Sequence, residues 1–345
     1  MAQKKVTIYD IAKRTGLSVA TISRVLNNSD DVKRETKEYV NKVIKEMNYV
    51  PNAIARSLKN KKTSSIGILV YAIDSPFFSE LIASIEDFFT NKDYHILLAT
   101  ISGSAKSEID LLNFLVKKEV EGIMLLGSYN DKNIYEELER ISKKIPIILV
   151  GDYIDLETIY SVNSDNLEGA YKAVKYLIDL GHRDIGILTG YKGQYDSEER
   201  LKGYKKALLE AGIEFNPNYV FPGDYSVEKC QNGIVQFIER NSKITALFAV
   251  SDMMAIGAMT GLLQHDYKVP DDISIMGFDN IKNASFVYPS LSTVDQRIKV
   301  LGRLAASLMI EALNSEKSYP QRVINKTNLI IRDSTGYVNS DRKRG

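Results

Sequence analysis

The sequence predicts a small all-α helix-turn-helix unit joined to an α/β core of two doubly wound parallel-sheet lobes. Within residues 7–27, apolar side chains recur twice at helical spacing, on either side of a glycine. From residue 65 onward, short apolar strands alternate with amphipathic helices, which indicates parallel sheets covered on both faces. A chain of 345 residues is too long for one ordinary core, and its alternating part alone is long enough for two lobes.

The composition is that of a soluble globular protein, with 44% hydrophobic and 26% charged residues. No apolar run approaches the ~18 residues that a membrane span needs. The first ten residues, MAQKKVTIYD, lack the apolar segment of a signal peptide. The single cysteine, Cys230, excludes an internal disulfide and is typical of a reducing compartment. We therefore expect a cytoplasmic protein with no membrane partner.

The net charge of +1 conceals a strong asymmetry between the two ends of the chain. Residues 1–62 contain 14 Lys and Arg against 6 Asp and Glu, a net charge of +8. The remaining residues contain 31 against 38, a net charge of −7. A small basic unit on an acidic body indicates a module that binds an anion, with a solvated basic face as the alternative.

Two short amphipathic helices are predicted around Gly16, a residue that can adopt positive φ at little cost. Ser18 is a predicted N-cap for the second helix, and Thr7 for the first. This arrangement is a helix-turn-helix, whose second helix enters the major groove of DNA. An ordinary helical hairpin is the alternative. The outward-facing residues of the second helix would be Val19, Ala20 and Arg24, with Thr21 and Ser23 beside them.

Residues 6–59 closely resemble the N-terminal headpiece of the LacI/GalR family of transcriptional regulators. The stretches that carry the resemblance are VTIYDIAKRTGLSVATISRVLNN and ETKEYVNKVIKEMNYVPNAIARSLK. The resemblance implies a headpiece over residues 1–50, a hinge helix and linker over 51–62, and a homodimer bound to near-palindromic operator DNA. It implies DNA contacts from Thr7, Tyr9, Ser18, Val19, Ala20, Thr21, Ser23, Arg24, Asn27, Asn52, Ala55 and Leu58. In the family, the leucine matching Leu58 wedges into the minor groove and kinks the duplex; a plain linker is the alternative.

The resemblance continues into residues 63–333, which are similar to the family's periplasmic-binding-protein core with three crossovers between its lobes. Lobe 1 would comprise residues 63–163 and 293–321, and lobe 2 residues 164–292 and 322–333. Residues 334–345 would form a tail. Ligands of open α/β sheets bind in the crevice at the carboxyl ends of the strands. The residues that stand where the family places its effector contacts are Phe77, Phe78, Asp152, Arg200, Tyr225, Asp252 and Asp279.

Arg200 and Asp279 on opposite sides of one pocket would suit hydroxyl groups, through a forked donor and a bidentate acceptor. This favours a sugar or a sugar phosphate as a small-molecule effector, while a purine remains an alternative. Asp252 could equally be the N-cap of a helix.

No cofactor, metal or enzymatic activity is expected. The three histidines, His95, His182 and His265, have no metal-ligand spacing, and the chain has no phosphate-binding loop, GxSxG or HExxH motif. Two alternatives to a metabolite-controlled repressor of a carbohydrate operon remain. One is the solute-binding protein of a transporter. The other is a regulator switched by a phosphorylated carrier protein, although Ser307 stands where that branch of the family has an arginine.

Overall fold

The computed structural model describes residues 6–26, 29–49, 63–101, 105–127, 131–154, 156–315 and 321–338. The chain forms two compact units, Met1–Thr63 and Ser64–Gly345. Four of the predicted DNA contacts, Asn27, Asn52, Ala55 and Leu58, lie outside the described residues. Among the described helices, none is long and apolar enough to cross a membrane.

The N-terminal unit is a three-helix headpiece of α1 (Ile8–Thr15), α2 (Val19–Leu26) and α3 (Arg34–Glu46). Each helix contributes to one small core of Ile11, Ile22, Val25, Val40 and Val43. The turn between α1 and α2 confirms the sequence prediction. Gly16 has φ 74°, and the Ser18 hydroxyl accepts a hydrogen bond from the Thr21 amide at 3.1 Å. The amide of Thr7 is bound by Asp10, whose carboxylate accepts it at 2.9 Å.

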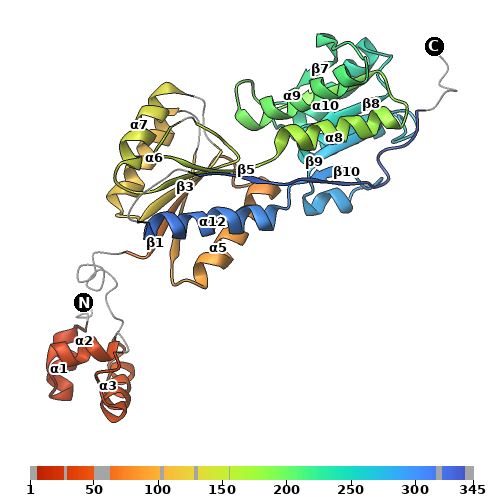
Figure 1. The fold of residues 1–345 in the computed structure, drawn as a ribbon. Coiled ribbons are helices and arrows are strands. Elements are labelled where there is room, and N and C mark those ends of the chain that lie inside the picture. The colour runs from red at the N-terminus through yellow and green to blue at the C-terminus, as the bar shows by residue number, and fades with distance from the viewer. Residues whose placement is uncertain are drawn as a thin grey trace. The chain divides into compact units, whose positions relative to one another are not determined.

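The first lobe contains a parallel six-stranded sheet in the order β11-β5-β4-β3-β1-β2. Its helices α6 (Ala105–Lys117) and α7 (Lys132–Ser142) lie on one side, and α5 (Pro76–Thr90) and α12 (Ile298–Asn314) on the other (Figure 1). Buried side chains of β1 alternate between the two faces, since Ile66 and Ile68 join one apolar cluster and Leu69 the other. The strands are β1 (Ser65–Val70), β2 (His95–Thr100), β3 (Gly122–Leu126), β4 (Ile147–Val150), β5 (Tyr160–Ser164) and β11 (Arg322–Asn325).

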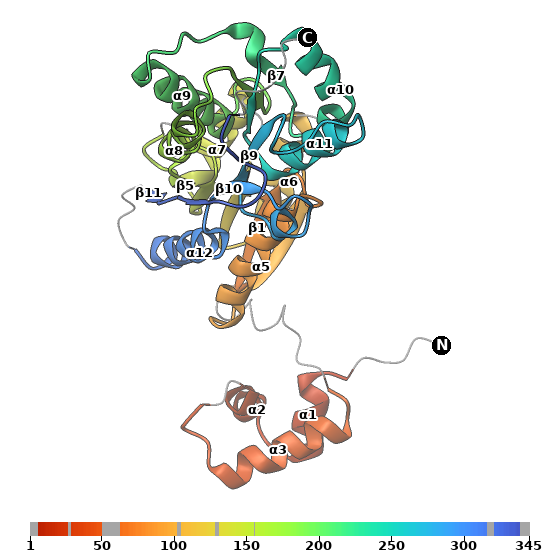
Figure 2. The same cartoon turned by 90° about the vertical axis from the view of Figure 1, so that its right-hand side faces the viewer.

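The second lobe contains a sheet in the order β12-β10-β9-β8-β6-β7, in which only β12 runs antiparallel among the described strands. Figure 2 shows α8 (Asn166–Asp179) and α9 (Tyr195–Glu210) on one side of this sheet, and α10 (Val227–Arg240) and α11 (Asp252–Leu263) on the other. Two short 3₁₀ helices, η1 (Pro217–Tyr219) and η2 (Lys282–Ser285), join its elements. The strands are β6 (Ile185–Thr189), β7 (Val220–Pro222), β8 (Ala246–Ala249), β9 (Ser274–Asp279), β10 (Ser292–Asp295) and β12 (Asn328–Ile330).

The crossovers between the lobes correct two predicted boundaries. The sequence predicts residues 293–295 in lobe 1, but β10 pairs with β9 in the second sheet. It predicts residues 322–325 in lobe 2, but β11 pairs in parallel with β5 in the first sheet. These strands have only four residues each, and their sheet is decided by backbone pairing that no local pattern encodes.

The predicted tail begins too early, because residues 334–338 pack on the second lobe. Ser334 is fully buried, and its carbonyl accepts a hydrogen bond from the Ile275 amide at 2.7 Å. The Val338 amide donates to the Leu180 carbonyl at 3.1 Å. Serine is a polar residue that the apolar pattern of buried strands and helices does not mark as buried. The sequence therefore predicts the end of the core at residue 333.

Candidate DNA interface and effector cleft

Helix α2 presents a small polar face opposite its buried side. Ile22 and Val25 point into the headpiece core, whereas Ala20 and Arg24, four residues apart, are exposed. Val19, Thr21 and Ser23 are half-buried beside them, and Ser18 is exposed at the helix start. Tyr9 on α1 is 72% exposed and so is accessible to a partner.

The second candidate site is a cavity of about 490 Å³ between the lobes of the core. It lies where strands of both sheets end. Tyr71 follows β1, Asp152 follows β4, Tyr191 follows β6, and Asp279 is the last residue of β9. The carboxyl ends of the two sheets therefore contribute side chains to one cavity, as expected for a ligand site in open α/β sheets.

Six of the seven predicted effector residues line this cavity, and Asp252 does not. The Asp252 side chain is fully buried beneath it. Its carboxylate accepts hydrogen bonds from the Thr293 hydroxyl at 2.5 Å and the Ile281 amide at 2.9 Å. The N-cap of α11 is Ser251, whose hydroxyl accepts from the Met254 amide at 3.3 Å. Asp252 thus ties α11 to the segments after β9 and in β10, which makes it a positioning residue.

Arg200 and Asp279 line the same side of the cavity, contrary to the prediction that they face each other across it. Both belong to the second lobe, and Arg200 Nη1 lies 3.8 Å from Asp279 Oδ1. Asp196 Oδ2 lies 3.7 Å from Arg200 Nη2. Burial raises the pKa of Asp279 to about 8, although Arg200 opposes that rise. Arg200 and Asp279 are close because of helix packing. Helix α9 packs on the second sheet, which places Arg200 next to the last residue of β9.

The Arg200 guanidinium is held by the protein itself. Nε donates to Asn166 Oδ1 at 2.9 Å, and Nη1 donates to the Val250 carbonyl. The guanidinium also stacks on the Phe278 ring at 3.9 Å. With only 4% of the residue exposed, Arg200 is as much a structural element as a surface for a ligand.

Asp279 combines burial with unusual backbone geometry. Its φ of 127° lies in a region that L residues rarely adopt, and Asn280 follows with φ 58°. Gln296 Nε2 donates to its Oδ1 at 2.5 Å. Strained residues of this kind concentrate at functional sites, because the surrounding structure must hold them in place.

The first lobe contributes an apolar and an acidic group. Phe77 and Phe78 lie in the first turn of α5 and meet edge to face, with their ring centroids 5.2 Å apart. Asp152 accepts a hydrogen bond from the Tyr153 amide at 2.7 Å, and burial raises its pKa to about 6.

Tyrosines connect the two lobes across the cavity, and most of them were not predicted. The ring centroids of Tyr71 and Tyr191 are 6.3 Å apart, and those of Tyr191 and Tyr225 are 6.1 Å apart. The Tyr225 hydroxyl donates to Asp196 Oδ2 at 2.8 Å. The i, i+4 spacing of Asp196 and Arg200 on α9 was a signal that could have identified Asp196. Lining residues that sequence reasoning missed include Tyr71, Asn166, Tyr191, Tyr195, Asp196 and Gln296.

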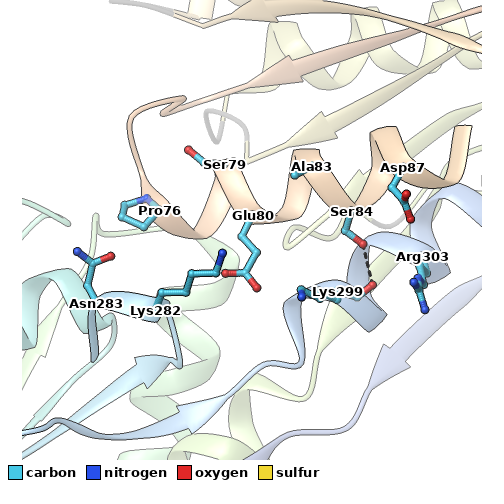
Figure 3. Close-up of a pocket in the computed structure, with 10 residues that line it drawn as sticks. All are labelled: Pro76, Ser79, Glu80, Ala83, Ser84, Asp87, Lys282, Asn283, Lys299 and Arg303. Atoms are coloured by element: carbon cyan, nitrogen blue, oxygen red, sulfur yellow. Dashed lines mark hydrogen bonds between the residues drawn. The ribbon is translucent and has the colours of Figure 1, made fainter. Parts of the chain in front are cut away.

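A second hollow of about 550 Å³ lies outside the cleft, along α5, α12 and η2 (Figure 3). It follows the seam where the Ser84 hydroxyl donates to the Lys299 carbonyl at 2.8 Å. Its charges are mixed: Glu80 and Asp87 on α5 accompany Lys299 and Arg303 on α12, with Lys282 from η2. Since the described residues that line this groove include none at a strand end, it is the weaker candidate for a metabolite site.

The other sequence candidates are structural. His182 is buried, with Nδ1 2.9 Å from the Thr245 hydroxyl and Nε2 3.0 Å from the Gly336 carbonyl. Because that carbonyl can only accept, Nε2 carries the proton, and burial lowers the pKa of the ring. Cys230 is buried in α10, and burial raises the pKa of its thiol to about 12. The described residues contain no group of His, Cys, Asp and Glu side chains suited to hold a metal ion.

Comparison with known proteins decides the family. Residues 7–52 match the model of bacterial regulatory proteins of the lacI family, and residues 174–335 match a periplasmic binding protein-like domain. The ribose operon repressor of Haemophilus influenzae is 35% identical over 95% of this chain and 98% of its own length. The chain belongs to the lacI family of bacterial regulatory proteins. It is therefore a DNA-binding transcriptional repressor by family, and not an enzyme.

Further members of the lacI family show the same full-length similarity. The repressor PurR of Photobacterium profundum is 35% identical over 96% of this chain and 99% of its own length. Catabolite control protein A of Priestia megaterium is 34% identical, with 90% and 93% covered. Among solved structures, the Lac repressor dimer bound to operator and an anti-inducer matches with a TM-score of 0.88 at 25% identity, and the CelR–cellobiose complex with 0.74 at 28%. Each covers 96% of this chain and 100% of the solved chain.

Proposed function

We propose that this lacI-family member is a homodimeric repressor of a carbohydrate operon, controlled by a sugar or sugar phosphate bound in the cleft. One observation carries the proposal: the cavity takes polar and aromatic side chains from both lobes of a chain that also has a DNA-binding headpiece. The similarity to a ribose operon repressor and to CelR in complex with cellobiose supports a carbohydrate as effector.

On the DNA side, the proposed partner is a near-palindromic duplex in the cytoplasm. A twofold dimer places two α2 helices in successive major grooves, so each half-site is read by Ala20 and Arg24 with their neighbours. The basic headpiece contributes phosphate contacts, whose strength falls as salt rises. Leu58 and its hinge neighbours are proposed to widen and kink the central minor groove.

Control by the metabolite requires that the ligand distinguish two arrangements of the lobes. The cleft meets this condition because Phe77 and Asp152 belong to one lobe, while Asp196 and Asp279 belong to the other. A ligand that bridges these groups stabilises one lobe arrangement and thereby changes operator affinity.

The test uses the purified full-length protein. Selection from a pool of random duplexes yields the operator, and titrations with and without a panel of sugars then measure its affinity. We expect one sugar to change operator affinity at least tenfold, and Phe77→Ala, which removes a lining ring, to abolish that response. Glu86→Gln, on an exposed turn of the same helix, serves as the control with an unchanged response. A duplex pool without enrichment contradicts the DNA-binding part, and a response that survives Phe77→Ala contradicts the location of the ligand.

The phosphorylated carrier protein is not proposed as the regulator. Ser307 is exposed on α12, and a serine hydroxyl has no positive charge with which to bind a phosphoserine.

A further inference from the structure

The charge of the cleft restricts the chemistry of the effector. Six of the described lining residues are acidic, namely Asp74, Asp152, Asp196, Asp224, Glu228 and Asp279. Arg200 is the one basic residue among the described lining residues. Asp224 is neutralised by Lys229, whose Nζ lies 2.6 Å from its Oδ2. The remaining carboxylates outnumber the single guanidinium.

Arg200 has no positive charge to spare for an anionic ligand. Its guanidinium lies between Asp196 at 3.7 Å and Asp279 at 3.8 Å, and it already donates to Asn166 and Val250. Even when Asp152 and Asp279 are protonated, Asp196 alone balances the guanidinium. A phosphate ester, with a charge of about −1.5 to −2 at neutral pH, would enter a site with no positive charge to offset its desolvation.

Three helix N-termini beside the cleft, which are common anion sites in proteins, carry acidic residues. The first turns of α9 and α10 contain Asp196 and Glu228, and Asp252 begins α11. The negative charges of these carboxylates lie at the positive N-terminal ends of the three helix dipoles, where a phosphate would otherwise bind. Helix α5 has no acidic residue in its first turn, but it begins with Pro76, which lacks an amide hydrogen, followed by two phenylalanines.

The same groups suit a neutral carbohydrate. Sugar hydroxyls are donors, and the carboxylates of Asp152 and Asp196 with the amide of Gln194 provide acceptors around the cavity. Aromatic rings on both lobes, Phe77 and Phe78 on one and Tyr191 and Tyr225 on the other, offer flat apolar surfaces. We infer that the cleft selects an uncharged saccharide and excludes its phosphate esters through the carboxylates that surround Arg200. This inference rests on the proposed function and narrows its effector class.

The first experiment compares matched pairs on the full-length protein by calorimetry: ribose and ribose 5-phosphate, glucose and glucose 6-phosphate, and cellobiose and its 6′-phosphate. We expect the neutral member of a pair to bind, and its ester to bind at least tenfold more weakly. An ester that binds more tightly than its parent sugar overturns the inference.

The second experiment needs no cognate sugar, because inorganic phosphate is the probe. Because the wild-type cleft should not bind phosphate, adding phosphate should leave the melting temperature of the wild-type protein unchanged. The isosteric double variant Asp152→Asn/Asp196→Asn removes two charges and should lower the Kd for phosphate at least tenfold, and adding Arg200→Met should reverse this gain. The control Glu80→Gln/Asp87→Asn makes the same charge change in the groove of Figure 3. If the cleft variant gains nothing, or if the control gains as much, the carboxylates of the cleft do not exclude anions and the inference is wrong.

The two proposals fail in different ways. If a phosphorylated sugar acts through the cleft and changes operator affinity, the proposed function stands and the inference falls. If no ligand changes operator affinity, the proposed control fails, while the phosphate measurement still decides the charge argument.

Discussion

Replacing Arg200 by methionine tests whether this residue is a structural ion of the second lobe. Methionine keeps most of the side-chain volume over Phe278 but removes every donor of the guanidinium. Asn166 Oδ1 and the Val250 carbonyl lose their partner, and the buried Asp279 carboxyl loses the nearest positive charge.

The expected cost follows from the burial of these groups. An unsatisfied buried acceptor costs about 1–3 kcal/mol. Removing one partner of a buried ion pair costs about 3–5 kcal/mol. Because Asp279 can bind a proton and so avoid part of the second cost, we expect Arg200→Met to lower the free energy of unfolding by about 3–5 kcal/mol in total. This is a large share of the roughly 5–15 kcal/mol that stabilises a typical domain.

Urea denaturation of the full-length chain at pH 7 measures the loss, followed by circular dichroism. Lys202→Met on the same helix is the matched control, since its ion pair with Glu199 is largely exposed on the lysine side and should change stability by less than about 1 kcal/mol. An Arg200→Met protein within 1 kcal/mol of the wild type would refute the structural role, and would leave the guanidinium free to serve a ligand.

Three further outcomes are expected. Arg24→Ala should reduce the preference for operator over scrambled duplex by about 1–3 kcal/mol in titrations while salt-sensitive binding remains, because the proposed base reading by Arg24 would use a bidentate arginine–guanine contact worth that much. An unchanged preference would exclude Arg24 from base reading. Asp279→Asn should gain stability relative to the wild type as pH rises from 4 to 8, by at most about 1.4 kcal/mol per pH unit. The sign follows from burial, which raises the pKa of Asp279 to about 8 in the folded protein, whereas the unfolded carboxyl ionises at about pH 4. Over this range the unfolded wild type has lost a proton that the folded wild type keeps, so the wild type is destabilised as pH rises. An equal stability difference between the two proteins at pH 5 and pH 8 would contradict it. Arg322→Met should change the Kd of a bound sugar by about two- to fivefold with little change in stability, because Arg322 stacks on Tyr153 at 4.2 Å in one lobe and donates to the Tyr195 hydroxyl in the other; calorimetry giving the wild-type Kd would show that this contact does not link the lobes.

The sequence by itself determined the local structure of the headpiece and the class of the core. Gly16 and Ser18 mark the turn between α1 and α2 because positive φ and N-capping depend on residues close by in the chain. The alternation of apolar strands and amphipathic helices likewise predicted two parallel-sheet lobes, since side-chain periodicity reports which faces are covered. The resemblance to the lacI family, and not periodicity alone, pointed to the six predicted residues that line the cleft.

Only the tertiary structure decided which distant groups meet. The structure places β11 in the first sheet and β10 in the second, contrary to the prediction. Strand pairing depends on backbone hydrogen bonds between segments far apart in sequence, which no local pattern encodes. The structure also places Asp252 beneath the cleft on Thr293 and Ile281, and it sets Arg200 beside Asp279 on the same side. A buried charge is stable only with partners, and packing rather than local sequence selects those partners.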